Sequence, residues 1–306
     1  MERQYLVLDI GGTFIKYAIM DRQAQFITQG KVATNTESEE AMIASLEVVR
    51  DAVADYDYEG VAISMPGRIE TAKGIAHTGG AYAWLNEYPA AEKYGAVFGK
   101  PCTIANDGKC AAYAESWFGA LSDVDYGAVL VLGTGIGGGI VLNKQVLMGS
   151  TGGAGELSLF VYNFDGLADS VGKEHSTNDF AWTTRISALS ISKKYAELKG
   201  LEHADGVMLF DAYEEGDPDA VAVIEEYARI AAAGILSLQS VLDLQRYAIG
   251  GGISARPAAT SVIAAEVNRI YDSKTSLPYS KPEVVTCKFG NEANLIGALA
   301  FHLGDA

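Results

Sequence analysis

Two stretches of this chain share one design, in which an apolar strand ends at a glycine-containing turn and a second apolar strand follows at once. The first is "VLDIGGTFIKYAIMD" at residues 7–21, and the second is "YGAVLVLGTGIGGGIVLNKQVLMG" at residues 126–149. Each predicts an antiparallel meander at the start of a lobe. Because this design occurs twice in the chain, we expect a duplicated α/β architecture of two lobes, with a boundary between Gly119 and Tyr126.

Further segments predict the remainder of both lobes. The first has helical spacing over residues 37–53, a buried strand from residue 60 that ends at Pro66-Gly67, and a strand-to-helix passage over residues 101–119. In the second, we expect helices at 186–200 and 219–242, a strand from 246, another helix and a strand at 283–290. Residues 291–303 predict a helix that returns to the first lobe. We therefore assign 1–119 plus 292–306 to an N-terminal lobe and 120–291 to a C-terminal lobe.

Charge and composition exclude several classes of partner. The net charge of −16 leaves no basic stripe for the phosphates of a nucleic acid, and an anionic membrane surface would repel the chain. The first residues enter a strand without the apolar core of a signal peptide, and no apolar run reaches membrane-spanning length. We expect a cytoplasmic protein that binds small ligands. Its three cysteines, Cys102, Cys110 and Cys287, form no C-x-x-C pair, which argues against a disulfide framework and a thiolate zinc site.

The glycine turns are candidates for phosphate binding. The string Gly133-x-Gly135-x-x-Gly138 matches the dinucleotide fingerprint, but a hairpin follows it where that motif requires a helix. No P-loop sequence is present either. Glycines in a hairpin turn let backbone N–H groups approach phosphate oxygens closely, so two such turns could grip a polyphosphate. The alternative is a pair of tight turns without a ligand. The candidate residues are Gly11, Gly12 and Thr13 in the first turn and Gly133, Thr134 and Gly135 in the second.

Three further positions extend this hypothesis to a nucleotide. Asp9 ends the strand before the first turn, where its carboxylate could orient Mg²⁺ through water. Lys16 could supply charge to the phosphates, or could be an ordinary surface lysine. A third glycine turn, with Gly251 and Gly252, leaves a strand and precedes a helix, which suits the adenosine end of a nucleotide.

One carboxylate is a candidate for the chemistry. Phosphoryl transfer to an alcohol needs a group that accepts the hydroxyl proton, and Asp107 stands at a strand-to-helix turn where it could point into a cleft. Asn106 could bind a sugar hydroxyl, and Glu156 could accept hydrogen bonds from two adjacent hydroxyls. The alternatives are a helix N-cap for the Asn-Asp pair and a solvated loop for the glutamate. His77 and His175 lack partner spacing and receive no role.

Five motifs together resemble the ROK family along nearly the whole chain. They are "LDIGGT" at 8–13, "MPG" at 65–67, "ANDGKCAAYAE" at 105–115, "LGTGIGGGI" at 132–140 and "GAGE" at 153–156. The resemblance implies an actin-like (ribonuclease H-like) ATPase fold, with two lobes around a cleft. It also implies ATP and Mg²⁺ at the glycine turns, a sugar at Gly67, Asn106, Asp107 and Glu156, Asp107 as general base, and a homodimer.

The chain departs from the family pattern after Glu156. Many members continue with a histidine and a zinc-binding cysteine motif, whereas this chain has Leu159 at the histidine position and no cysteine between Cys110 and Cys287. We therefore expect no zinc site. The sugar stays open among glucose, fructose, an amino sugar such as N-acetylmannosamine, and the glucose unit of a β-glucoside.

Several functions are compatible with these residues. The leading one is an ATP-dependent hexose kinase. A ROK-type sugar-sensing regulator, or a non-catalytic sugar-binding protein, is the alternative, but a regulator needs a DNA-reading module before the sugar domain, for which the sequence leaves no room. The third is an actin-like or chaperone-like ATPase, against which "ND" and "GAGE" favour a small hydroxylated acceptor.

Overall fold

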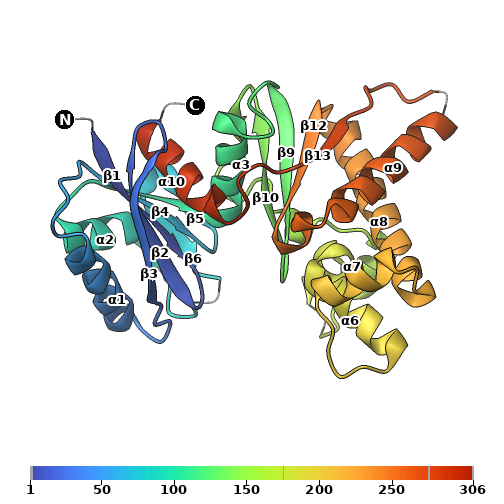
Figure 1. Ribbon diagram of the computed structural model, residues 1–306, viewed down its shortest axis with the longest axis horizontal. Coiled ribbons are helices and arrows are strands. Elements are labelled where there is room, and N and C mark those ends of the chain that lie inside the picture. Colours follow the sequence, from blue (N-terminus) through green and yellow to red (C-terminus); the bar gives the residue numbers. More distant parts are fainter. Residues whose placement is uncertain (1–2, 81, 175, 275, 305–306) are drawn as a thin grey trace. The chain divides into compact units, whose positions relative to one another are not determined.

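The computed structural model describes residues 3–304 except 81, 175 and 275, so His175 lies outside the described residues. The chain divides into two compact units. The first unit comprises Met1–Phe118, Lys144–Gly155 and Asn291–Ala306, and the second comprises Gly119–Asn143 and Glu156–Gly290. Each unit is α/β (Figure 1).

This division differs from the predicted lobe boundaries at one segment. The prediction gave all of 120–291 to the second lobe, whereas Lys144–Gly155 belongs to the first unit. The reason is packing between segments that are distant in the sequence: β11 (Gln145–Val146) lies against α3 (Asp107–Phe118), and the Ser116 hydroxyl donates to the Lys144 carbonyl at 3.1 Å. The turn at Gly152 also lies directly on the backbone of Ile69, where a Cβ atom would come within 2.0 Å of the carbonyl oxygen.

The first unit is built on a five-stranded sheet with the order β3-β2-β1-β4-β8. Its strands are β1 (Gln4–Ile10), β2 (Phe14–Asp21), β3 (Phe26–Ala33), β4 (Val61–Met65) and β8 (Cys102–Asn106). The pairs β1–β2 and β2–β3 are antiparallel, which confirms the predicted meander, and β1–β4 and β4–β8 are parallel. Strands β1 and β4 are apolar and almost entirely buried, as expected of strands covered on both faces.

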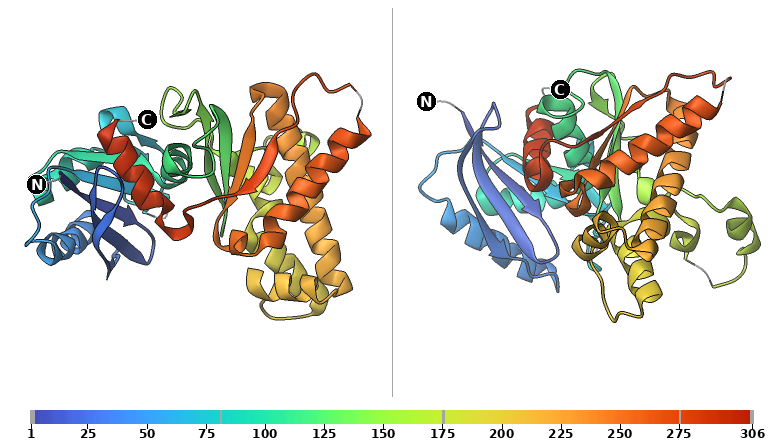
Figure 2. Two further views of the ribbon diagram at one scale, coloured as in Figure 1. Left: turned by 45° about the horizontal axis from the view of Figure 1, so that its top comes forward. Right: turned by 45° about the vertical axis from the view of Figure 1, so that its right-hand side comes forward.

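Helices cover both faces of this sheet (Figures 1 and 2). On one face lie α1 (Glu39–Ala52) and α2 (Ala90–Phe98), and on the other lie α3 and the returning C-terminal helix α10 (Ala293–Leu303). Helix α1 begins after Ser38, whose hydroxyl accepts from the N–H of Ala41, and two glutamates follow in its first turn. A separate three-stranded sheet holds β5 (Ile69–Glu70), β6 (Ile75–Thr78) and β7 (Asn86–Tyr88).

The second unit repeats the strand design of the first. Strands β9 (Tyr126–Leu132) and β10 (Ile136–Leu142) are antiparallel, as predicted for the second glycine turn. Strand β12 (Arg246–Gly250) runs parallel to β9, and β13 (Glu283–Thr286) runs parallel to β12. The principal helices are α6 (Ala188–Lys199), α7 (Gly206–Glu214), α8 (Pro218–Leu242) and α9 (Pro257–Ser273). Two short helices, α4 (Phe164–Asp169) and α5 (Thr183–Ile186), lie in the segment between β10 and α6.

Among the described residues, none of the helices combines the length and apolar character needed to span a membrane.

Candidate active site

The first glycine turn joins β1 to β2. The Gly11 N–H donates to the carbonyl of Phe14 at 3.0 Å, and the Gly11 carbonyl accepts from the hydroxyls of Thr34 at 2.7 Å and Tyr82 at 3.0 Å. Neither Gly11 nor Gly12 has a positive φ, and a Cβ atom on Gly12 would meet no described atom within 4 Å. Backbone conformation and packing therefore do not require a glycine at Gly12, and the space beside it is open to close approach by a ligand.

Asp9 lies beside this turn with its carboxylate held from several sides. Its side chain is 10% exposed, and its Oδ1 accepts from the Ser64 hydroxyl at 3.1 Å and from the Asn294 amide at 3.0 Å. Lys16 pairs with Asp9 in the β1–β2 register, and its Nζ lies 3.5 Å from the Asp9 Oδ2. Lys16 is therefore a partly exposed lysine paired with this carboxylate, and its role toward phosphates stays a prediction.

A single fixed carboxylate suits Mg²⁺, which keeps most of its waters and takes few protein ligands beside substrate phosphates. In the described part of the chain, no three His, Cys, Asp or Glu side chains group in a way that would hold a metal ion. The residues around Asp9 thus fit a water-mediated magnesium ion bound together with a nucleotide.

The second glycine turn joins β9 to β10 in the second unit. The Gly133 N–H donates to the carbonyl of Gly135 at 2.9 Å. Neither residue has a positive φ, and a Cβ atom on Gly133 would meet no described atom within 4 Å. Gly251, in the third glycine turn, does require glycine. Its φ is 92°, and an added Cβ atom would lie 2.2 Å from the carbonyl oxygen of Leu132.

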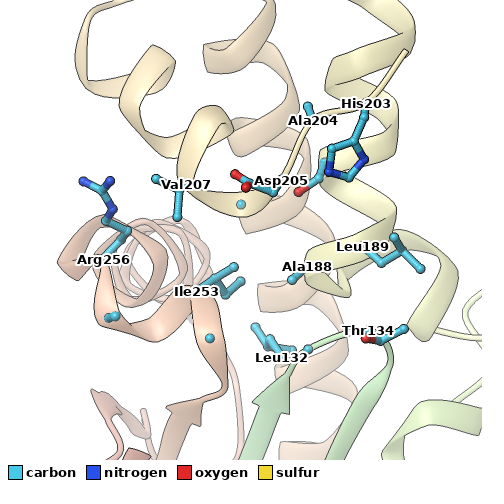
Figure 3. A pocket seen from close by; sticks show the side chains of 15 residues that line it. Leu132, Thr134, Ala188, Leu189, His203, Ala204, Asp205, Val207, Ile253 and Arg256 are labelled. Carbon is cyan, nitrogen blue, oxygen red and sulfur yellow. The ribbon is translucent and has the colours of Figure 1, made fainter. Parts of the chain in front are cut away.

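A cavity of about 430 Å³ brings the second and third glycine turns together within the second unit (Figure 3). Its wall is mainly apolar, with Ala188 and Leu189 from the start of α6 and Ile253 from the turn after β12. Such a cavity suits a flat base, with polar groups at its rim. The full lining is Leu132, Gly133, Thr134, Ala188, Leu189, Ser192, His203, Ala204, Asp205, Gly206, Val207, Gly252, Ile253, Ala255 and Arg256.

The predicted catalytic pair lies at the end of β8 in the first unit. The Asn106 Oδ1 accepts from the N–H of Lys109 at 3.1 Å and so caps α3, while the Asn106 Nδ2 donates to the Asp107 Oδ1 and to the Gly67 carbonyl, both at 2.9 Å. Asp107 begins α3 and is only partly buried, and its Oδ1 also accepts from the N–H of Gly108 at 2.8 Å. Asn106 is therefore the N-cap, and it orients Asp107 at the same time.

Gly67 requires its glycine for a structural reason. Its φ is 102°, and an added Cβ would lie 2.0 Å from the carbonyl oxygen of Thr78. The backbone of the Pro66-Gly67 turn and the Asn106-Asp107 pair are thus fixed to each other.

Glu156 begins the second unit's larger segment and is exposed. Its Oε1 accepts from the nearby Ser158 hydroxyl, and a short 3-10 helix, Leu157–Leu159, follows it. This arrangement leaves its role as a sugar ligand a prediction.

The structure therefore groups the candidate residues in two sets. The first unit holds Asp9, Gly11, Gly12, Thr13, Lys16, Gly67, Asn106 and Asp107, and the second holds Gly133, Thr134, Gly135, Glu156, Gly251 and Gly252.

The sequence pattern did not indicate four supporting side chains in the first unit. Thr34, Ser64, Tyr82 and Asn294 each donate a hydrogen bond to Asp9 or to Gly11. Burial of Tyr82 and the charges of Asp9 and Asp107 raise the pKa of its phenol to about 12. No motif signals these residues, because each is distant in sequence from the group that it holds.

Comparison with known proteins agrees with this architecture. The fold is that of two-lobed actin-like ATPases: a ROK hexokinase from Thermus thermophilus superposes with a TM-score of 0.80 at 24% identity, covering 99% of this chain and 100% of that one. The ROK family model matches residues 5–304, so the chain belongs to the ROK family.

Two relatives are more similar in sequence. The β-glucoside kinase of Listeria monocytogenes is 31% identical over 293 residues, which is 95% of this chain and 94% of the relative. A ROK glucokinase from Streptomyces griseus, solved in complex with glucose and AMPPNP, is 26% identical with a TM-score of 0.79 and covers 97% of this chain and 98% of that one.

Proposed function

We propose that this protein transfers the γ-phosphoryl group of ATP to a hydroxyl of a hexose unit, with Asp107 as the general base. Relatives that match nearly the whole chain support the reaction class: they include β-glucoside kinases, a glucokinase and N-acetylmannosamine kinases. The chain is thus an ATP-dependent carbohydrate kinase.

The observation that carries the assignment of Asp107 is that its carboxylate is held by Asn106, whose amide also donates to the Gly67 carbonyl. A general base must be held within hydrogen-bonding reach of the proton that it accepts. Asn106 and the Gly108 N–H both donate to the Asp107 Oδ1, which fixes the plane of the carboxylate at the start of α3. In the reaction, the sugar hydroxyl gives its proton to Asp107 while its oxygen forms a bond to the γ-phosphorus, and the bond from that phosphorus to the leaving ADP oxygen breaks.

The other candidate residues bind and orient the nucleotide. The N–H groups of the two glycine turns would contact its phosphates, and the second unit's cavity would hold its base. Asp9 would hold Mg²⁺ through water, and this ion would neutralise charge on the phosphates.

For the acceptor, we propose the glucose unit of a β-glucoside. The relative with 31% identity is a β-glucoside kinase, as are two relatives with 28% and 29% identity. Leu159, 44% exposed, stands where many family members have a histidine, and an apolar side chain there would change the contacts to the sugar. A homodimer, which the family resemblance implies, stays a prediction that light scattering after gel filtration would test.

The test is ADP release from MgATP with glucose, fructose, N-acetylmannosamine and cellobiose, measured for the wild type and for Asp107→Asn. We expect cellobiose to give the highest kcat/KM, and Asp107→Asn to lower kcat by about 10²–10⁴-fold. The asparagine oxygen can still accept from Asn106 and Gly108, so sugar binding measured by thermal shift should change little. Near-normal turnover in the variant would remove Asp107 from the role of base, and sugar binding without turnover in the wild type would indicate a sensor.

A further inference from the structure

Tyr82 joins the first glycine turn to a distant part of the first unit. Its ring is buried, with 1% of the residue exposed, and its hydroxyl donates to the Gly11 carbonyl at 3.0 Å. The Thr34 hydroxyl donates to the same carbonyl at 2.7 Å. The position of the Gly11 carbonyl is thus fixed by two donors from separate segments, and the N–H of Gly12, which lies in the same peptide plane, is fixed with it.

The glycine pair Gly79-Gly80 joins Tyr82 to the turn that carries Gly67. The Tyr82 N–H donates to the Gly79 carbonyl at 3.1 Å, which ties the tyrosine to the glycine pair Gly79-Gly80. An added Cβ on Gly80 would lie 3.2 Å from the Pro66 Cβ and 3.6 Å from the Gly67 nitrogen. A continuous set of contacts therefore runs from Gly67, in the proposed sugar site, through Gly79-Gly80 and Tyr82 to Gly11, in the proposed phosphate site.

Charged groups of both proposed sites also act on the Tyr82 phenol. The carboxylates of Asp9 and Asp107 both act on Tyr82, and together with burial they raise the pKa of its hydroxyl to about 12. The hydroxyl therefore stays protonated at neutral pH and remains a hydrogen-bond donor to Gly11.

We propose that Tyr82 is a positioning residue that couples the two substrates, so that sugar bound at Gly67 strengthens nucleotide binding at the first glycine turn. This inference rests on the proposed function, because it takes Gly67 as part of the sugar site and Gly11 as part of the phosphate site. A sugar packed against the Pro66-Gly67 turn would restrict Gly79-Gly80, and Tyr82 would then hold the Gly11–Gly12 peptide with the Gly12 N–H oriented for phosphate. Coupling of this kind is a difference in nucleotide affinity between the sugar-bound and sugar-free protein.

The test is the dissociation constant of MgADP, measured by calorimetry with and without a saturating concentration of the panel sugar that gives the highest turnover. In the wild type we expect the sugar to tighten MgADP binding at least about fivefold. Tyr82→Phe keeps the ring and removes only the hydroxyl, so the ratio of the two constants should fall below about twofold.

Two matched variants separate coupling from a general loss of stability. Thr34→Val removes the other donor to the Gly11 carbonyl but lies outside the path from Gly67, so it should weaken MgADP binding equally with and without sugar and keep the wild-type ratio. Tyr88→Phe removes another buried tyrosine hydroxyl of the first unit, which donates to Glu39 at 2.8 Å, and should leave both constants unchanged.

The outcomes are distinct. A wild-type ratio near one, or a ratio that survives Tyr82→Phe, overturns the coupling role while sugar-dependent ADP release leaves the proposed function intact. Loss of the ratio in Thr34→Val as well as in Tyr82→Phe also overturns it, because the effect would then reflect a loosened turn. Absence of ADP release with every panel sugar refutes the proposed function itself.

Discussion

Gly297 lies where α10 crosses α3, and replacing it with alanine should destabilise the first unit. An added Cβ atom would come 1.8 Å from the carbonyl oxygen of Cys110 and 2.3 Å from its carbonyl carbon. Both are backbone atoms of α3, so no side-chain rotation can relieve the contact. Because ordinary contacts begin near 3.4 Å, the two helices would have to separate by about 1.6 Å.

The cost follows from two opposing contributions. Overpacking of a closely packed contact costs about 1–3 kcal/mol, and occasionally more. Alanine gains up to about 1 kcal/mol over glycine in helix propensity. With a collision as deep as this one, we expect a net loss of about 2 kcal/mol, which lowers the melting temperature of a unit of this size by roughly 4–8 °C.

Gly30→Ala is the matched control. Its added Cβ would lie 2.4 Å from the Tyr17 hydroxyl oxygen and 2.5 Å from the Tyr17 Cζ, a collision nearly as deep, but with the outer end of a partly exposed side chain instead of with backbone. Scanning calorimetry should therefore show the melting temperature of the first unit lowered in Gly297→Ala and lowered much less in Gly30→Ala. Equal melting temperatures for Gly297→Ala and the wild type would refute the reasoning that the α3–α10 crossing is closed at Gly297.

Three further predictions concern other parts of the chain. Asn294→Ala removes a donor to Asp9, so the KM for MgATP should rise roughly tenfold, as expected for the loss of a hydrogen bond to a charged group, while the sugar KM stays unchanged; an equal rise in both KM values would contradict this. His77 contacts Glu87 and Glu70, which raise the pKa of its imidazole, so its stabilising contribution is complete below about pH 6.5 and is lost as pH rises through the raised pKa. His77→Gln should therefore lower the melting temperature more at pH 5.5 than at pH 9, and a pH-independent difference would disprove it. Ala188→Phe would place a ring in the second unit's cavity, so MgADP should no longer raise the melting temperature. If MgADP raised the melting temperature of this variant as much as that of the wild type, the nucleotide would bind at another site.

The sequence predicted most of the main strands and helices because their patterns are local. Both meanders, the helix after Ser38 and the long helix α8 follow from apolar spacing and capping residues that stand next to each other in the chain. The small sheet of β5, β6 and β7 was not predicted, since its strands have two to four residues and no alternation that distinguishes them from turns. The assignment of Lys144–Gly155 failed for a related reason, because contacts with α3 and Ile69 decide it and neither is local.

For the candidate site, motif spacing identified the residues at the turns but none of those that hold them. Asp9 and Gly11 stand in one short motif, whereas their donors come from positions 34, 64, 82 and 294. Such donors become visible only when the chain is folded, since a hydroxyl or amide has no spacing that marks its acceptor. Lys16 is the exception, because the hairpin register that pairs it with Asp9 follows from the turn between them.

The Asn106-Asp107 pair shows why the structural and the catalytic interpretations of one motif need not exclude each other. An asparagine before a helix is a common N-cap, and Asn106 does cap α3 through its Oδ1. The amide has a second end, however, and its Nδ2 donates to both Asp107 and Gly67. An aspartate at position 106 could cap the helix equally well, but it has no N–H to donate and would place a second negative charge beside Asp107. Asn106→Asp keeps the cap, so it should lower the melting temperature less than Asn106→Ala does, while both variants should lower kcat; equal kcat values for Asn106→Asp and the wild type would show that the cap is the residue's whole role.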